Sequence, residues 1–277
     1  MNKCELKDKE FKLLSDLVYN TIGINLGDSK KELLRTRLGK RLRMLGIPTF
    51  KEYYKYVTED NKDELTNLFD AISTNLTSFF REQKHFDYLS DTVLPEILDE
   101  RSRRGDFQVR VWSCACSTGE EPYSLAITLA EYLGLSSRYG VKILATDVNT
   151  EVLDQATKGL YKEARVENLP KIILKKYFLR GEGKQSGYVK IKRHLQNMIT
   201  FRRINLTAPR YPFRKQFDFI FCRNVMIYFD KHTQKQIIDK LYYHLKPGGY
   251  LFLGHAESLT GIDTDFKYIQ PTIYKKV

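Results

Sequence analysis

The pattern of apolar residues changes at Gly105, and this change constrains the fold more than any other feature of the chain. Beyond it, short apolar runs alternate with helical segments, which is typical of βαβ units around a mainly parallel sheet. The expected strands are 109–113, 141–146, 198–202, 217–222 and 250–254. The expected helices are 123–133, 152–158 and 233–245, and the last of them ends at the turn signal Lys246-Pro-Gly-Gly249.

Residues before about 100 have the periodicity of helices. One helix has a single apolar face of Phe11, Leu14, Val18 and Ile22, and the next has a face of Leu33, Leu34, Leu38, Leu42 and Leu45. A capping box at Thr49-Phe-Lys-Glu52 opens a third helix, and 63–74 form a fourth. Pro95 is expected to kink or break a long segment, 82–104.

These patterns predict an all-α domain over residues 1–85, followed by an α/β domain of the Rossmann-like class over 86–277. Residues 163–197 do not fit the alternation of the second domain. They contain a hairpin pattern with a Gly-rich loop, which predicts a small antiparallel β insertion.

Charge and cysteine content narrow the possible partners and location. The excess of 46 basic over 34 acidic residues favours an acidic partner, and nucleic acid, a membrane surface and an acidic protein all qualify. No apolar run reaches ~18 residues, and the first eight residues lack the apolar core of a signal peptide. The four cysteines form no disulfide framework, so a reducing cytoplasm is expected.

Ligands of open α/β sheets bind at the carboxyl ends of the strands, and the predicted strands end in four suggestive segments. The first is followed by the small residues of 114–119 and by a helix start with Glu120 and Glu121, where a nucleotide site and a well-capped turn are evenly matched interpretations. Asp147 suits ribose hydroxyls or a helix N-cap. Asn205-Leu206 suits an adenine edge and ring, and Arg223-Asn224 suggests a site or a structural pairing.

Four segments together resemble the CheR family, the bacterial chemotaxis-receptor glutamate O-methyltransferases. They are Asn75-Leu-Thr-Ser-Phe-Phe-Arg-Glu82, Trp112-Ser-Cys-Ala-Cys-Ser-Thr-Gly-Glu-Glu-Pro-Tyr-Ser124, Phe221-Cys-Arg-Asn-Val-Met-Ile-Tyr-Phe-Asp230 and Leu245-Lys-Pro-Gly-Gly249. The resemblance extends in order over nearly the whole chain. It implies a class I methyltransferase domain that uses S-adenosylmethionine to methylate glutamates of membrane chemotaxis receptors, releasing S-adenosylhomocysteine.

The resemblance also assigns residues. It implies cofactor contacts at Asn75, Thr77, Arg81, Glu120, Asp147, Asn205, Leu206, Arg223 and Asn224. Glu121 is the alternative to Glu120. The glutamate carboxylate is ionised at neutral pH, so catalysis can depend on positioning, with Arg81 organising the site and Tyr228 forming a polar wall.

A basic helix and the β insertion are the expected docking surfaces. The helix carries Lys31, Arg35, Arg37, Lys40, Arg41 and Arg43. By resemblance it meets the acidic methylation helices of receptors, which would recruit the enzyme to the membrane, and RNA is the competing partner. The insertion resembles a subdomain that binds a receptor tail peptide, here by strand addition near 181–187.

Other chemistries fit the sequence less well. A nucleic-acid aminomethyltransferase would carry an Asn/Asp-Pro-Pro-aromatic motif where this chain has Arg223-Asn-Val-Met226, and a dehydrogenase would carry a Gly-x-Gly-x-x-Gly turn. A non-enzymatic adaptor need not keep the full set of cofactor contacts. No metal site is expected, because the histidines at positions 85, 194, 232, 244 and 255 show no paired-ligand spacing.

Overall fold

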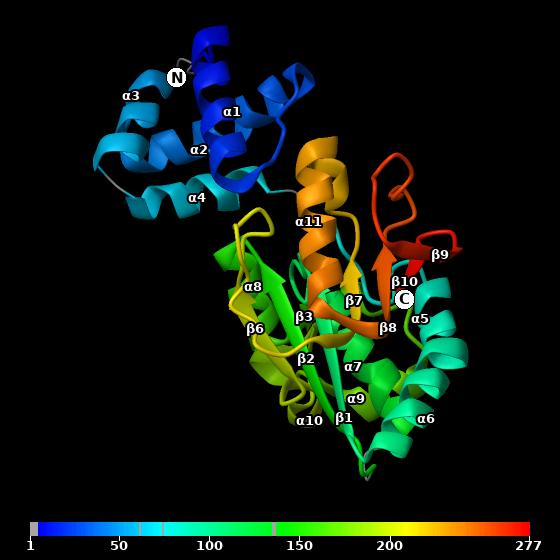
Figure 1. Cartoon of the computed structure of the whole chain (residues 1–277). Helices are drawn as coiled ribbons and strands as arrows, with labels where there is room; N and C mark the ends of the chain where they lie inside the picture. Colours follow the sequence, from blue (N-terminus) through cyan, green and yellow to red (C-terminus); the bar gives the residue numbers. More distant parts are fainter. Residues whose placement is uncertain (1–4, 61, 74, 135–136) are drawn as a thin grey trace.

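The computed structural model describes residues 5–60, 62–73, 75–134 and 137–277, and Figure 1 shows its arrangement. The N-terminal part is a bundle of helices that lies beyond the arrowheads of strands β2, β7 and β8. Its helices are α1 (Asp8–Ile22), α2 (Lys31–Leu45), α3 (Phe50–Lys55) and α4 (Lys62–Ile72), with short helical turns at Asp28–Lys30 and Tyr56–Asp60.

The predicted apolar faces form the core of this helical domain. The four predicted residues of α1 are all buried, as are Leu34, Leu38 and Leu42 of α2, whereas Leu33 and Leu45 are half-buried. The predicted N-cap at Thr49 is also confirmed, because its side chain accepts a hydrogen bond from the Glu52 backbone N–H. Helix α3 begins at Phe50, directly after this cap. The predicted end of the fourth helix, at 74, lies outside the described residues.

A seven-stranded sheet in the order β6-β2-β1-β7-β8-β10-β9 forms the centre of the second domain. The strands are β1 (Gln108–Cys114), β2 (Gly140–Asp147), β6 (Ile199–Arg203), β7 (Phe217–Cys222), β8 (Leu245–Leu253), β9 (Phe266–Gln270) and β10 (Ile273–Lys276). The first five run parallel, and each overlaps a predicted strand. From β1, the chain adds β2 and β6 on one side of the sheet and then β7 and β8 on the other. Ligands of such sheets bind at the switch point, which lies here between β1 and β7.

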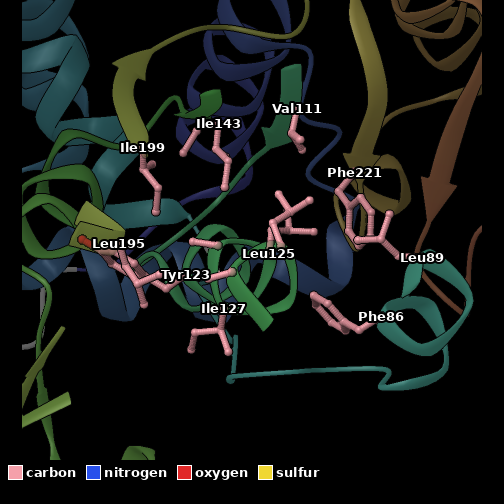
Figure 2. Packing of buried hydrophobic residues seen from close by; sticks show 14 of the residues in the cluster. Phe86, Leu89, Val111, Tyr123, Leu125, Ile127, Ile143, Leu195, Ile199 and Phe221 are labelled. Atoms are coloured by element: carbon pink, nitrogen blue, oxygen red, sulfur yellow. The ribbon is translucent and has the colours of Figure 1, made fainter. Parts of the chain in front are cut away.

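Helices cover both faces of the sheet. They are α5 (Lys84–Tyr88), α6 (Leu94–Arg104), α7 (Glu120–Leu133), α8 (Thr150–Lys158) and α11 (Lys231–His244). Figure 2 shows how Tyr123, Leu125 and Ile127 of α7 pack among residues of the strands, such as Val111 and Phe221, within one continuous buried cluster. This packing fixes the start of α7 at the carboxyl end of β1.

Two features near the C-terminus differ from the sequence-based expectation. β8 begins at Leu245, so the predicted turn at 246–249 lies within the strand. Its glycines instead produce a register shift against β7, with Gly248 at a φ of +75°. The antiparallel pair β9 and β10 was not expected, because both strands are short, with five and four residues, and neither has a clear alternation of apolar and polar residues.

The long segment around Pro95 is helical throughout but irregular. A π-helical turn at Leu89–Val93 joins α5 to α6, and Pro95 lies in the first turn of α6, directly after this wider turn. The predicted irregularity is therefore present as a wide turn. The helix ends at Gly105, which adopts a left-handed conformation, as the change of pattern there suggested.

The β insertion forms a separate three-stranded antiparallel sheet in the order β3-β5-β4, made of β3 (Leu160–Lys162), β4 (Phe178–Arg180) and β5 (Tyr188–Ile191). Two short helices, α9 (Lys171–Tyr177) and α10 (Arg193–Gln196), accompany it. The predicted hairpin is present as β4 and β5.

The two domains have separate cores. The apolar cluster of the helical domain reaches Ile72, whereas Phe79 and Phe86 belong to the cluster of the α/β domain. In terms of packing, the division therefore lies after Ile72 and before Phe79, whereas the sequence patterns placed it at residue 85. Among the described residues, no helix is long and apolar enough to cross a membrane.

Candidate functional site

A pocket opens where the carboxyl ends of the parallel strands meet the helical domain. Its walls come from the loop after α1, the N-terminal end of α2, the segment 75–81, the turns after β1, β2 and β6, and the segment after β7. Of the residues expected to bind the cofactor or act in catalysis, nearly all line this pocket: Asn75, Thr77, Arg81, Asp147, Asn205, Leu206, Arg223, Asn224 and Tyr228. The fold thus brings together side chains from four separate segments.

The turn after β1 has an unusual backbone. Ala115 and Ser117 adopt positive φ angles of 51° and 49°, and Gly119 follows at 96°. A left-handed conformation is unfavourable for residues with a Cβ, and such strain collects at functional sites. A Cβ at Gly119 would lie 2.8 Å from Ala156, so glycine is required there. The strained turn places Ala115 and Ser117 on the pocket wall.

Asp147 holds this turn in place from the end of β2. Its Oδ2 accepts a hydrogen bond from the Ser117 backbone N–H at 2.8 Å, and its Oδ1 accepts one from Asn149 N–H at 2.9 Å. The N-cap of α8 is Asn149 and not Asp147, so the N-cap interpretation of Asp147 is wrong. Burial raises the pKa of Asp147, against the effect of the backbone donors. Asp147 also lines the pocket, and each of its oxygens can accept one further hydrogen bond.

The two glutamates that begin α7 have different surroundings. Glu121 lines the pocket, where its Oε1 accepts a hydrogen bond from Ser113 Oγ at 2.7 Å. Glu120 does not line it; the side chain is fully buried against Thr118 Oγ1 and forms an ion pair with Arg165 of the β insertion. The family resemblance implies a cofactor contact at Glu120, and the geometry instead favours its neighbour Glu121. Burial raises the pKa of Glu121, opposed by the nearby Arg223.

A strap, defined here as residues 75–83, joins the two domains and forms one side of the pocket. Arg81 donates to the Leu76 carbonyl at 2.8 Å, which closes the strap on itself. Leu76 is 76% exposed at the pocket mouth. The strap is anchored by the Phe80 backbone N–H, which donates to Ser124 Oγ at 2.9 Å, and by Arg165, which donates to the Thr77 carbonyl.

Arg223 ties the strap to the sheet. Its side chain is only 1% exposed and donates to Glu82 Oε2 at 2.8 Å, to Glu121 Oε2 at 3.1 Å and to the Arg81 carbonyl. Burial would raise the pKa of Glu82, but hydrogen bonds from Arg223 and Asn224 lower it to about 2. These contacts fit the interpretation of Arg223 as a structural ion-pairing residue. The Asn224 side chain donates one hydrogen bond, to Glu82 Oε1 at 3.1 Å.

Asn205 and Leu206 lie where the α/β domain meets α1. Asn205 Nδ2 donates to the Thr21 carbonyl at 2.8 Å, and its Oδ1 accepts two hydrogen bonds from Thr207. The second amide hydrogen of Asn205 remains available for a ligand. Leu206 is buried and adds apolar surface to the same wall.

The expected basic surface on α2 divides into structural and exposed charges. Arg41 forms a two-pronged hydrogen-bonded pair with the buried Glu64, and Arg37 donates to the carbonyls of Ile72 and Ser73. These two hold the helical domain together. Lys31 and Arg35 pair with exposed carboxylates of Asp8 and Glu32, and Lys40 and Arg43 are exposed.

Several pocket residues were not found from the sequence. They are Ile24, Asn25, Leu26, Lys30, Leu33, Phe86 and Val148. The loop after α1 reaches the pocket because the Asn25 backbone N–H donates to the Tyr228 carbonyl at 2.9 Å. Contacts of this kind depend on domain packing and leave no local signal.

Comparison with known proteins agrees with this two-domain site. Residues 9–73 match the family model described as the CheR methyltransferase all-alpha domain, and residues 75–275 match the CheR methyltransferase SAM binding domain. The boundary between the matched regions coincides with the division between the two cores.

Curated relatives match almost end to end. The chemotaxis protein methyltransferase of Borreliella burgdorferi is 41% identical over 96% of this chain and 94% of its own length. The protein of the same name from Escherichia coli is 41% identical over 97% of this chain and 91% of its own. Chemotaxis protein methyltransferase 2 of Pseudomonas aeruginosa is 39% identical, with coverages of 96% and 92%.

Proposed function

Because the chain belongs to the CheR family of methyltransferases, we propose that it methylates the γ-carboxylates of glutamates on chemotaxis receptors, using S-adenosylmethionine. The products are glutamate methyl esters and S-adenosylhomocysteine, and the role is sensory adaptation. One observation supports this most: the strained turn, Asp147, the strap and α2 converge on a single pocket between the two domains.

The pocket residues suit the parts of S-adenosylmethionine. Asp147 has lone pairs left for ribose hydroxyls, and Leu206 with the neighbouring aliphatic side chains suits the adenine ring. Asn205 keeps one amide hydrogen for the adenine edge. Glu121, Asn75, Thr77 and Asn224 also line the pocket, and the Glu121 carboxylate would favour the amino group and the positive sulfur.

Methyl transfer to a carboxylate needs little chemistry from the protein. S-adenosylmethionine supplies an activated methyl group, since its leaving group is a neutral thioether. The acceptor is ionised at neutral pH and needs no general base. Arg81 would therefore orient the substrate carboxylate from the strap, and Tyr228 would form the facing wall and exclude water.

The receptor would approach along α2. Lys30 and Leu33 at its beginning line the pocket, and Lys40 and Arg43 extend the basic surface away from it. Lys31 and Arg35 can exchange their exposed partners for receptor carboxylates, because surface ion pairs contribute only ~0–1 kcal/mol. The enzyme would thus work in the cytoplasm and be recruited to membrane receptors.

The β insertion offers a second contact. β4 pairs with β5 on one side only among the described strands, and a groove beside it is lined by Leu179, Gly181 and Tyr188, among others. Leu179 and Tyr188 are exposed. A receptor tail peptide would add to this edge as a further strand.

The decisive experiment supplies methyl-labelled S-adenosylmethionine and receptor-containing membranes, followed by mild base. Glutamate methyl esters release volatile methanol under these conditions, and methylated nucleic-acid bases do not. Base-labile label on receptor protein supports the proposal. Stable label on added RNA, with none on the membranes, would overturn the proposal and indicate RNA as the partner of the basic surface.

A further inference from the structure

Three side chains that are far apart in the sequence meet beside Arg223, outside the pocket lining. Glu82 lies near the end of the strap, His85 lies in the first turn of α5, and His255 lies just after β8. One ligand atom from each lies within 4.8 Å of the other two. The histidines show no paired-ligand spacing in the sequence, so no metal site was expected, and spacing alone cannot show that these segments converge.

His85 shares a hydrogen bond with Thr272, whose Oγ1 lies 2.7 Å from the ring nitrogen Nε2. When the Thr272 hydroxyl donates its one hydrogen to the Pro271 carbonyl, 2.6 Å away, it accepts from His85 Nε2–H. The other ring nitrogen, Nδ1, then carries a lone pair. His85 is 3% exposed, and Nδ1 has no hydrogen-bond partner among the described residues.

This lone pair faces another electron-rich atom. Glu82 Oε2 lies 3.5 Å from His85 Nδ1 and 3.9 Å from His255 Nε2. Glu82 already accepts hydrogen bonds from Arg223, from Asn224 and from the His255 backbone N–H, which leaves one lone pair of the carboxylate for a further partner. In the tautomer with Nε2–H, a buried nitrogen lone pair faces a carboxylate, which is unfavourable unless a cation lies between them.

The donor set and its dimensions fit a transition metal. Two imidazoles and one carboxylate are a common ligand set of zinc sites with an open fourth position. Zinc–ligand distances of ~2.0–2.2 Å place tetrahedral ligands roughly 3.3–3.6 Å apart, close to the two separations measured here. His255 is 54% exposed and can close the remaining gap by rotation. Thr272 supplies the outer hydrogen bond that orients a ligating histidine.

We propose that Glu82, His85 and His255 form a binding site for a divalent transition-metal ion of the zinc class, with a water molecule as the fourth ligand. The ion reaches the site from the solvent side of His255. The guanidinium of Arg223 opposes a cation, yet it contacts two carboxylates, Glu82 and Glu121, so the cluster keeps a formal negative charge.

The test uses tag-free, full-length protein and Zn²⁺ alone, with binding measured by calorimetry and metal content after dialysis. Cys4 lies outside the described residues, so all proteins carry Cys4→Ser to remove that thiol. The expected result is one Zn²⁺ per chain. Co²⁺ at the same site should give the visible absorption of a four-coordinate complex.

His255→Ala is the main variant, because the side chain is half-exposed and its loss leaves the core intact. It should weaken Zn²⁺ binding at least tenfold and abolish the Co²⁺ spectrum. His232→Ala, which removes an exposed histidine on α11, is the matched control and should bind like the wild type. Glu82→Gln, with folding checked by circular dichroism, should also lose binding. Wild-type affinity in His255→Ala, or no binding by the parent protein, would overturn the site.

Discussion

The carboxylate of Asp147 accepts a hydrogen bond from the Ser117 backbone N–H, 2.8 Å from Oδ2, and so couples the end of β2 to the strained turn after β1. One side chain thus stabilises an unfavourable backbone and presents acceptors to the pocket. This double task makes Asp147 the most sensitive position of the proposed cofactor site.

Replacing Asp147 by Asn should weaken S-adenosylmethionine binding by roughly 10- to 100-fold, since a hydrogen bond to a charged group contributes ~1.5–3 kcal/mol. Calorimetric titration measures this directly. Asp154→Asn, on the exposed face of α8, is the control and should bind normally. Unchanged affinity in Asp147→Asn would remove the residue from the cofactor site.

Arg81→Ala should lower kcat by about 100-fold, as expected for a misplaced substrate. The guanidinium contacts only the Leu76 carbonyl within the strap, so the fold should persist. Steady-state methylation of receptor membranes separates kcat from KM. Arg81→Lys should recover part of kcat if positive charge orients the carboxylate, and wild-type turnover in Arg81→Ala would exclude the role.

Arg223→Met should destabilise the protein by about 3–5 kcal/mol, because it leaves the carboxylates of Glu82 and Glu121 without their shared partner. Urea unfolding measures the loss. Lys235→Met breaks an exposed pair with Asp239 and should cost less than ~1 kcal/mol. Equal losses in the two variants would show that Arg223 is not the structural tie described above.

The pair of Arg41 and Glu64 should give the helical domain an acid-sensitive stability. Burial would raise the pKa of Glu64, but hydrogen bonds from Arg41, Asn67 and Tyr53 lower it below its ordinary value of 4.5. A lowered folded-state pKa stabilises the fold above the unfolded-state pKa, and this stability is lost as the pH falls below about 4.5.

Unfolding curves between pH 6 and pH 3 test this expectation. Glu64→Gln should be less stable at pH 6 and should lose less stability on acidification than the wild type. Glu59→Gln, in an exposed pair with Lys55, should keep the wild-type slope. The same slope in Glu64→Gln would contradict the assignment.

Charge reversal on α2 tests receptor docking. Lys40→Glu with Arg43→Glu should slow association with acidic receptor helices roughly 10-fold or more at low salt, because both side chains are exposed and steer the partner. The effect should appear in KM and shrink at high salt. Lys51→Glu with Lys55→Glu, on α3, is a control of equal charge change. Equal effects of both pairs would indicate net charge and not a docking surface.

The sequence predicted those parts of the fold that depend on local patterns. The helical faces of α1 and α2 and the five parallel strands follow from apolar periodicity, and the cap at Thr49 follows from its own tetrapeptide. β9 and β10 escaped prediction because their pairing with each other and with β8 depends on tertiary context.

The candidate site was predictable at the strand ends and not elsewhere. Asp147, Asn205 and Asn224 follow apolar strands, and this position alone marks them. Which of Glu120 and Glu121 faces the pocket depends on Arg165, which lies in the β insertion. The structural duties of Arg37 and Arg41 likewise depend on partners in or after α4, so a charge count could not separate them from Lys40 and Arg43.

The strap at 75–83 is both the covalent link between the domains and a wall of the pocket. The two domains are therefore not interchangeable modules. A chimaera joined within the strap would have a pocket wall made partly from each parent protein. A junction at 73–75 keeps the strap with its anchors Ser124 and Arg165, but it still separates Asn205 from its native contact at Thr21. Swapping helical domains between relatives would thus alter the catalytic half as well as the choice of receptor.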